Sequence, residues 1–379
     1  MMLNIRTLVL AGFQRGVSTR WRWIFVIGLV LLLLRTCRIF AKRRRFSNEL
    51  RCKPAQAQAP VQDPFLGLDF LYDNLFRRNS GSRLAARHET FCRLGKTYSV
   101  QRCTYHTVHT CDSRNIKHML ATRFPDFVLP ELRNRAIASF LGFGIFSING
   151  HGWARARAVL RPGFAKHKVD GILDMIEGHL DALWKQLPSD DRTVDLQPLF
   201  FEFAMDVSTE FLLGHSTSEL RGAEFRSRNH QFVSDYLLCS EAVVKKLRLG
   251  PLQFLVRDKE AAKAKTRVFE YIDSFIKEAK QRKSRDEPNH GYDVLQEIQN
   301  IAPDHKTLRD QVLHILLASR DTVACLLSNL VFELSRNPSV QTRLREEVFR
   351  CAGTERPTVE QLHSMKYLKW CVNECKMPN

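Results

Sequence analysis

The stretch LRDQVLHILLASRDTVACLLSNLVFELSR, residues 308–336, decides the fold class. Its apolar residues recur at helical spacing, and as a helix it would be about 45 Å long. The middle, residues 313–334, is apolar on nearly every side, so we expect this helix to be buried deep in a large domain. A helix of this length and composition predicts a mainly helical fold.

An acid and a hydroxyl interrupt this apolar run, in Ala318-Ser319-Arg320-Asp321-Thr322. A buried acid lowers the stability of the fold unless it has a hydrogen-bonding or charged partner, so it is kept either by such a partner or by a role in catalysis. Two interpretations follow from the residues alone. In the structural one, Asp321 pairs with Arg320 or another basic group and Thr322 bonds to a helix carbonyl. In the functional one, Asp321 and Thr322 belong to a site.

A second candidate site lies in Trp153-Ala154-Arg155-Ala156-Arg157. Trp153 and Arg157 are four residues apart and share a helix face, where an indole N–H and a guanidinium could together hold an anionic group. The alternative is the end of an amphipathic helix with exposed arginines. The preceding residues 141–152 contain four glycines, which predicts a flexible loop able to approach a ligand.

The rest of the chain reads as helices with one small sheet. Tyr98-Ser99-Val100 and residues 106–109 alternate with period two, which predicts a hairpin or two short strands. Breaks with Pro, Gly, Asp or Asn separate further segments of helical spacing. These segments are residues 169–187, 196–213, 259–283, 292–300, 339–351 and 364–376. We therefore predict a mainly α (α+β) domain.

Composition narrows the class of protein. The 379 residues are 44% apolar and 26% charged, which excludes a disordered, collagenous or wholly membrane-embedded chain. The ten cysteines form no Cys-x-x-Cys pair, so we predict no zinc or iron–sulfur site. The net charge is +18, of which the first 60 residues carry +11. The body shows no nucleic-acid-binding motif, so we expect no nucleic-acid partner.

The basic amino-terminal segment points to a membrane. Twelve uncharged residues, 23–34, would form a helix about 18 Å long, short of the ~30 Å of a bilayer core. Flanking arginines can snorkel to the membrane surface, so a short span is possible. The basic run from Lys42 to Arg45 predicts that the chain after this helix faces the cytoplasm. We expect a membrane anchor in residues 1–45, a Pro-rich linker in 46–64 and the main domain in 65–379. A cleaved signal peptide and a mitochondrial transit peptide are the alternatives.

Six features of the sequence stand in a fixed order between residues 65 and 375. They are Leu141-Gly142-Phe143-Gly144-Ile145-Phe146, Gly152-Trp153 with Arg157 and Leu160-Arg161-Pro162-Gly163-Phe164, Leu199-Phe200-Phe201, Asp206 with Thr209-Glu210-Phe211-Leu212-Leu213-Gly214, Ile315 to Thr322, and Tyr367-Leu368 to Glu374-Cys375. In this order they resemble the cytochrome P-450 family of haem-thiolate monooxygenases, closest to the fungal branch that hydroxylates n-alkanes and fatty acids.

The resemblance implies a haem cofactor and gives roles to matching positions. Trp153 and Arg157 match the pair that contacts a haem propionate. Ala318 and Ser319 lie where the long helix crosses the porphyrin. The usual residue at 319 is Gly, so the Ser hydroxyl implies a modest perturbation of the groove for dioxygen. The implied partners are a membrane, an NADPH-dependent flavin reductase and a lipophilic small molecule, at the endoplasmic reticulum with the domain facing the cytoplasm.

The resemblance also implies catalytic and structural roles near the centre and the end of the chain. Asp321 and Thr322 match the acid–alcohol pair that relays protons. Glu374 matches the acid of a Glu-x-x-Arg motif, but position 377, where the arginine is expected, holds Met377. The loop with the axial cysteine would lie beyond Asn379. We therefore expect a domain incomplete at its carboxyl end, with an inactive remnant as the alternative to a monooxygenase that hydroxylates a fatty acid, an alkane or a secondary-metabolite intermediate.

Overall fold

The computed structural model describes most of the chain. The described residues are 80–102, 105–164, 172–190, 192–218, 220, 229–284, 294–301 and 304–375, together with scattered positions between 23 and 60. Met377 lies outside them, and so does the expected anchor apart from scattered helical positions. The predicted domain boundaries at residues 45 and 64 stay a prediction.

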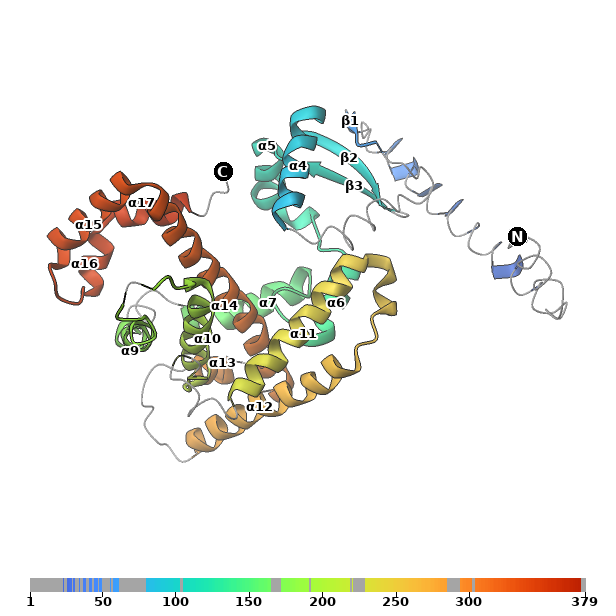
Figure 1. Ribbon diagram of the computed structural model, residues 1–379. Helices are drawn as coiled ribbons and strands as arrows, with labels where there is room; N and C mark the ends of the chain where they lie inside the picture. Colours follow the sequence, from blue (N-terminus) through green and yellow to red (C-terminus); the bar gives the residue numbers. More distant parts are fainter. Residues whose placement is uncertain are drawn as a thin grey trace, which may run out of the picture. The chain divides into compact units, whose positions relative to one another are not determined.

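The chain divides into two compact units. The first is Met1–Asp69 with Asn79–Ile116, and the second is Phe70–Arg78 with Lys117–Asn379. The first unit holds a three-stranded sheet in the order β1-β2-β3 (Figure 1). Its elements are β1 (Ala57–Gln58), α4 (Ser80–Leu94), β2 (Thr97–Arg102) and β3 (Tyr105–Thr110); α5 (Ser113–Lys117) follows them.

The two predicted strands are confirmed as an antiparallel pair. Thr97 lies opposite Thr110, and Arg102 lies opposite Tyr105. Tyr98 is buried at the base of this pair, with its ring 5.0 Å from that of Phe91 on α4. The strand β1 pairs with β2 in parallel and lies in the segment for which the sequence predicts a linker.

The second unit is helical, with its core around α14 (Figure 1). Helix α14 packs against α10 and α12, while α11 packs against α12 and α6. Met205, Ile272 and Leu313 are fully buried in this core. The bounds are α6 (Glu131–Leu141), α10 (Leu196–Leu213), α11 (Asn229–Leu249), α12 (Lys259–Ser284), α13 (Val294–Ile301) and α14 (His305–Arg336).

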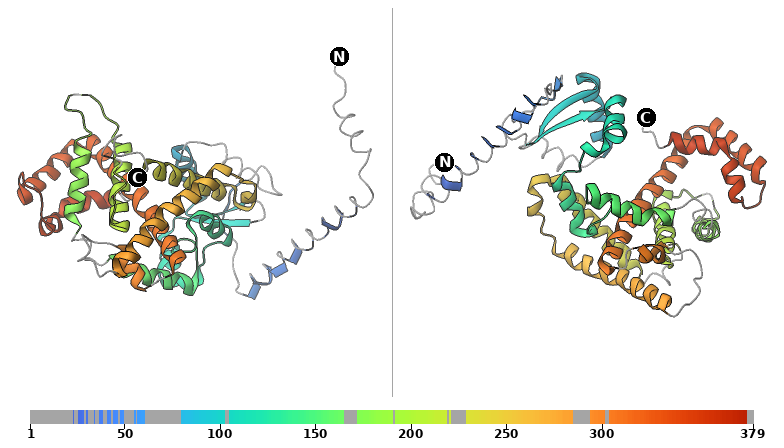
Figure 2. Two further views of the ribbon diagram at one scale, coloured as in Figure 1. Left: turned by 90° about the horizontal axis from the view of Figure 1, so that it is seen from below. Right: turned by 180° about the vertical axis from the view of Figure 1, so that it is seen from behind.

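The remaining helices of the second unit surround this core. α7 leads to a short 3-10 turn, and α15, α16 and α17 gather at the carboxyl end of α14 (Figure 2). The bounds are η1 (His118–Thr122), η2 (Phe124–Asp126), α7 (Gly150–Leu160), η3 (Arg161–Phe164), α9 (Leu173–Trp184), η5 (Gly250–Leu255), α15 (Pro338–Ala352), α16 (Val359–Ser364) and α17 (Lys366–Glu374).

Capping side chains fix where the two central helices begin. A carboxylate oxygen of Asp195 accepts the Gln197 N–H at 3.0 Å at the start of α10, and Asp304 accepts the Thr307 N–H at 2.8 Å at the start of α14. Helix α10 ends at Gly214, whose φ of 69° is the left-handed conformation that glycine tolerates best. These local signals explain why the predicted range of α10 matches the structure.

The burial expected for the middle of α14 is found only in its first half. Leu308, Leu313 and Leu316 are buried, but beyond Leu316 only Ala324 is buried among the described residues of the helix. The prediction for residues 313–334 was therefore wrong beyond Leu316, apart from Ala324. Apolar composition does not by itself bury a helix: Phe332 lines cavities with residues of α10 and α17 and is still 54% exposed.

One described helix, α14, has the length and apolar composition of a membrane-spanning helix. Core helices of soluble domains share both properties. The first half of α14 is buried among α10, α12 and α13, so we treat it as the core helix of the second unit.

Candidate functional site

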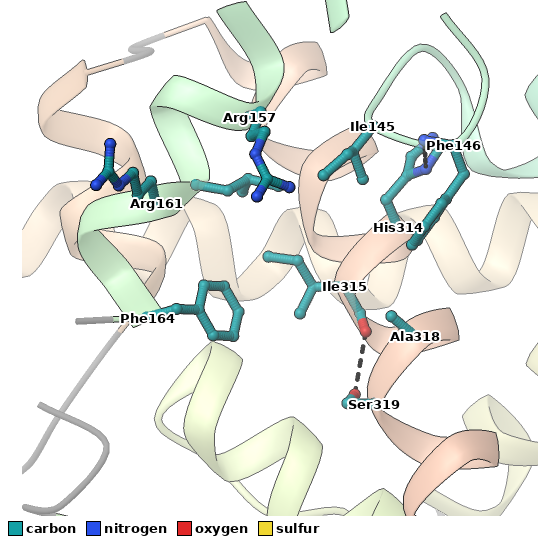
Figure 3. A pocket seen from close by; sticks show the side chains of 10 residues that line it. Ile145, Phe146, Arg157, Arg161, Phe164, His314, Ile315, Ala318 and Ser319 are labelled. Atoms are coloured by element: carbon teal, nitrogen blue, oxygen red, sulfur yellow. Dashed lines mark hydrogen bonds between the residues drawn. The ribbon is translucent and has the colours of Figure 1, made fainter. Parts of the chain in front are cut away.

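A cavity of about 580 Å³ lies in the second unit between α14, the α7–η3 segment and the loop that precedes α7. This volume lies within the ~300–1,000 Å³ that is usual for ligand and cofactor sites. Most of its walls are apolar, and two arginines stand on one side (Figure 3). The lining residues are Ile145, Phe146, Arg157, Leu160, Arg161, Phe164, His314, Ile315, Ala318 and Ser319.

Arg157 reaches this cavity from the helix that the sequence predicts. In Figure 3 its side chain and that of Phe164 extend toward Ile315, whereas the Arg161 guanidinium lies away from Ile315. The Arg157 guanidinium carbon is 5.6 Å from the centre of the Trp153 ring, a cation–π distance. The predicted pairing of Trp153 and Arg157 on one helix face is therefore found.

Trp153 itself does not line the cavity. Its ring is half-buried and packs against Phe124, with the ring centres 5.3 Å apart. Trp153 therefore acts on the cavity only through the guanidinium that lies over it. Arg155, two residues away, is exposed and does not line the cavity either.

Ala318 and Ser319 bring α14 to the opposite wall. The Ser319 hydroxyl donates a hydrogen bond to the Ile315 carbonyl at 3.1 Å, so it is turned back onto its own helix (Figure 3). Arg157 is distant in the sequence from Ala318 and Ser319, and the structure places all three around one cavity.

Asp321 and Thr322 lie one turn further along α14 and do not line the cavity. The Arg320 guanidinium donates to the Asp321 carboxylate at 2.7 Å, and the Thr322 hydroxyl donates to the Ala318 carbonyl at 2.6 Å. The Asp321 side chain is 55% exposed. Both contacts are those of the structural interpretation of these residues, so in this conformation neither group faces the cavity.

Glu374 ends α17 and is exposed, far along the chain from the cavity. It lines a second cavity of about 630 Å³ with residues of α14, including Glu333. Helix α17 is held to α15 by Glu347, which accepts the backbone N–H of Tyr367 at 2.9 Å and of Leu368 at 2.8 Å. The role that the resemblance gives Glu374 stays a prediction.

His314 lines the cavity and was assigned no role from the sequence. Its side chain is completely buried on α14, and this burial lowers its pKa to about 4. The signal available in the sequence was a histidine inside an apolar helical run. Ile145, Phe146 and Phe164 were likewise given no individual role, although they stand in runs that carry the resemblance.

The cavity fits a flat apolar group that carries carboxylates. Ile145, Leu160 and Ile315 offer apolar walls, and the guanidinium of Arg157 offers a partner for an anionic substituent. The residues that line the cavity thus fit the periphery of haem. None of the eight cysteines that the structure describes is among them, so we assign no axial thiolate.

Comparison with known proteins agrees with the resemblance. A family model described as "Cytochrome P450" matches residues 63–375. Cytochrome P450 monooxygenase himC of Aspergillus japonicus is 36% identical over 89% of this chain and 62% of its own length. Cytochrome P450 monooxygenase FPY7 of Fusarium mangiferae is 33% identical over 96% of this chain and 72% of its own.

A third relative, cytochrome P450 52A9 of Candida maltosa, is 33% identical over 93% of this chain and 71% of its own length. The chain spans 62–72% of the length of these three relatives. The family model covers well over half of the chain, and the mainly helical fold with one small sheet agrees with it. This chain therefore belongs to the cytochrome P450 family.

Proposed function

We propose that this chain functions as a cytochrome P450-type monooxygenase, which hydroxylates a lipophilic substrate with dioxygen and electrons from a reductase. The observation that carries the proposal is the cavity itself, in which Arg157, Ala318 and Ser319 meet around apolar walls. The substrate class we propose is a fatty acid or an alkane, in keeping with the branch that the sequence resembles, with a secondary-metabolite intermediate as the alternative.

In this proposal, Arg157 holds a carboxylate of haem, and the Trp153 ring beneath its guanidinium limits the orientations that the guanidinium adopts. Haem, when bound, supplies the iron at which dioxygen is activated. Ile315, which is buried, and Ala318 present apolar surface to that face of the cavity, which keeps water from it and strengthens charge interactions there.

Asp321 and Thr322 are the proposed proton carriers. To serve the cavity, the Thr322 hydroxyl must leave the Ala318 carbonyl, and the Asp321 carboxylate must leave Arg320. A rotation of the Thr322 side chain breaks a neutral hydrogen bond, which costs on the order of 1 kcal/mol. A rotation of the Asp321 side chain breaks an ion pair whose carboxylate is 55% exposed, and such pairs contribute about 0.2–1 kcal/mol. The described geometry is thus a resting arrangement from which the relay requires a change of rotamer.

The membrane and the reductase are proposed as partners. The basic segment that precedes the domain supports attachment to an anionic membrane surface, with residues 1–45 as the anchor and the domain on the cytoplasmic side of the endoplasmic reticulum. An NADPH-dependent flavin reductase is the electron donor that the family resemblance implies.

Titration of the full chain with haem, followed by absorbance, tests the role of the cavity. Arg157→Leu removes the guanidinium that lines the cavity, and Arg155→Leu removes an exposed guanidinium from the same helix as a matched control. Because a charge-assisted hydrogen bond contributes about 1.5–3 kcal/mol, we expect Arg157→Leu to weaken haem binding roughly 10- to 100-fold. Arg155→Leu is expected to leave the affinity within about twofold.

Equal effects of the two substitutions, or no haem binding by the wild type, would contradict the proposal. The absorption band of the reduced carbon monoxide complex then separates the two functional alternatives. A thiolate-type band supports a monooxygenase, and its absence supports a haem-binding protein without monooxygenase activity.

A further inference from the structure

Two buried polar side chains on α14 hold the loop that forms one wall of the cavity. His314 is completely buried, and Asp310, one turn earlier on the same helix, is 3% exposed. Both face residues 142–147, the first part of the loop between α6 and α7. Burying a polar group lowers the stability of the fold unless the group has a hydrogen-bond partner. The partners of these two side chains therefore indicate their structural role.

Every polar atom of the His314 ring contacts this loop. Its Nδ1 accepts the Phe146 backbone N–H at 3.3 Å, which requires that the ring proton sits on Nε2. Nε2 then faces the Gly142 carbonyl and the Ser147 hydroxyl, each at 3.4 Å. The neutral ring thus supplies one acceptor and one donor to the loop backbone, which a protonated ring does not.

Asp310 and Ser147 make the other hydrogen bonds that hold residues 142–147 in place. The Asp310 carboxylate accepts the Phe143 N–H at 2.9 Å. The Ser147 hydroxyl donates to the Gly142 carbonyl at 2.8 Å and accepts the Gly144 N–H at 3.0 Å. Each of these bonds closes the loop on itself or on α14.

The glycines show how closely the loop approaches α14. A Cβ at Gly144 would lie 2.5 Å from the His314 ring, and a Cβ at Gly142 would lie 2.1 Å from the Asp310 carboxyl carbon. Gly142 also has a φ of +73°, which side chains of L-residues rarely adopt. The loop backbone is therefore in direct contact with both polar side chains.

The held loop carries two residues of the cavity wall. Ile145 and Phe146 both line the cavity, and the Phe146 ring stacks on the His314 ring with the centres 5.7 Å apart (Figure 3). From the other side, Arg133 of α6 donates to the Phe146 carbonyl at 2.8 Å. The position of this wall thus depends on hydrogen bonds made to its backbone.

We propose that His314 is a positioning residue, which fixes the 142–147 loop through its neutral ring and so sets the shape of the cavity wall that faces the bound group. Asp310 anchors the other end of the same loop. The part of this proposal that concerns the cavity rests on the proposed function, because it assumes that the cavity is the binding site.

Three variants of the full chain test the proposal. His314→Asn keeps one acceptor and one donor, whereas His314→Leu removes both. His179→Leu is the matched control, because His179 is a buried histidine of α9 that bonds Glu210 at 2.7 Å and does not line the cavity. The first readout is backbone amide hydrogen exchange of Phe143 and Phe146, and the second is the dissociation constant for added haem.

We expect His314→Leu to speed exchange of the Phe146 amide at least about tenfold, since one lost hydrogen bond of about 1.4 kcal/mol corresponds to that factor. His314→Asn should stay within about threefold of the wild type, and His179→Leu should leave the loop unchanged. Haem binding should weaken in His314→Leu and be restored in His314→Asn.

Unchanged exchange of Phe146 in a folded His314→Leu would overturn the proposal. Faster exchange with unchanged haem affinity would overturn the claim that the loop shapes the binding site. Failure of the wild type to bind haem would overturn the proposed function instead, and the exchange rates would still decide whether His314 holds the loop.

Discussion

Among the residues that the structure describes, Arg157 contacts an aromatic ring and no carboxylate. The guanidinium lies over Trp153, and Trp153 in turn packs against Phe124. With no carboxylate partner among the described residues, this guanidinium can attract an incoming carboxylate. An arginine paired with an aspartate would first have to give up its partner.

Replacement of Trp153 tests this arrangement. Trp153→Leu removes the ring under the guanidinium, and we expect haem affinity to fall about two- to fivefold, because an exposed cation–π contact contributes about 0.5–1 kcal/mol. Trp153→Phe keeps a ring and should recover most of the affinity in the same absorbance titration. Identical affinities for the two variants would show that the ring does not orient Arg157.

Gly144 tests the contact between the loop and α14 through stability. Gly144→Ala places a methyl group 2.5 Å from the buried His314 ring, and we expect the free energy of unfolding to fall by about 1–3 kcal/mol. The matched control is Gly178→Ala in the middle of α9, where a Cβ meets nothing within 4 Å. That substitution should raise stability by about 0.5–1 kcal/mol.

Urea denaturation measures both changes. A Gly144→Ala variant as stable as the wild type would mean that the loop withdraws from α14 without cost. The opposite signs expected for two Gly→Ala changes separate the local contact from the general effect of removing a glycine.

The sequence predicts individual site residues where a short motif carries their chemistry. The spacing of Trp153 and Arg157 is enough to place them on one helix face. His314 was missed because its role depends on a loop more than 160 residues earlier in the chain. Which backbone groups a buried ring meets is decided by tertiary packing.

Helix α10 also depends on tertiary contacts, through side chains that bond to the segment following the helix. Asp206 is buried and accepts hydrogen bonds from the Thr217 hydroxyl at 2.7 Å and from the Leu220 N–H at 3.1 Å. The Thr209 hydroxyl accepts the Thr217 N–H at 3.1 Å. Side chains within α10 thus fix the path of the chain that leaves the helix after Gly214.

Asp206→Ala should therefore destabilise the second unit strongly. It leaves the buried donors of Thr217 and Leu220 without this acceptor, and we expect the free energy of unfolding to fall by on the order of 2–3 kcal/mol. The cap variant Asp195→Ala, at the exposed start of the same helix, should cost only about 1 kcal/mol. Equal losses in thermal or urea denaturation would contradict this ranking.

The helices that the sequence predicts are those with strong local signals. The predicted range 196–213 matches α10, and 259–283 differs from α12 by one residue. Helices α6 and α11 were not predicted. α6 begins with the mixed run Glu131-Leu132-Arg133-Asn134-Arg135, and α11 lies between α6 and α12, so packing determines both more than apolar periodicity does.

The burial of His314 predicts that the stability of the whole protein depends on pH. Its pKa is about 4 when folded against an ordinary value of 6.5, so between these pH values the unfolded chain binds a proton that the folded chain does not. This contribution is complete above pH 6.5 and is lost as the pH falls toward 4. Burial raises the pKa of Asp310, which acts in the opposite direction, and Arg133 faces the same loop from α6.

Comparison with His314→Asn isolates the histidine contribution. We expect the stability difference between wild type and His314→Asn to shift by on the order of 2–3 kcal/mol against the wild type between pH 7 and pH 4. Urea denaturation at each pH measures this shift. Parallel pH profiles for the two proteins would mean that His314 titrates normally and is not buried as a neutral ring.

The order of the matching runs identified the family correctly, although no single run does so by itself. The extent of burial along α14 was not predictable in the same way. A helix sequence records which faces are apolar, whereas burial depends on which other segments reach those faces. That information lies in the rest of the chain.

The exposed second half of α14 has a practical consequence for work at the bench. Val323, Val331 and Phe332 lie open on this helix, and Phe349 and Trp370 are more than half exposed on α15 and α17. Apolar surface of this kind promotes self-association in aqueous buffer. Preparations of the isolated polypeptide should therefore form soluble aggregates that grow with concentration in light scattering and that disperse in mild detergent.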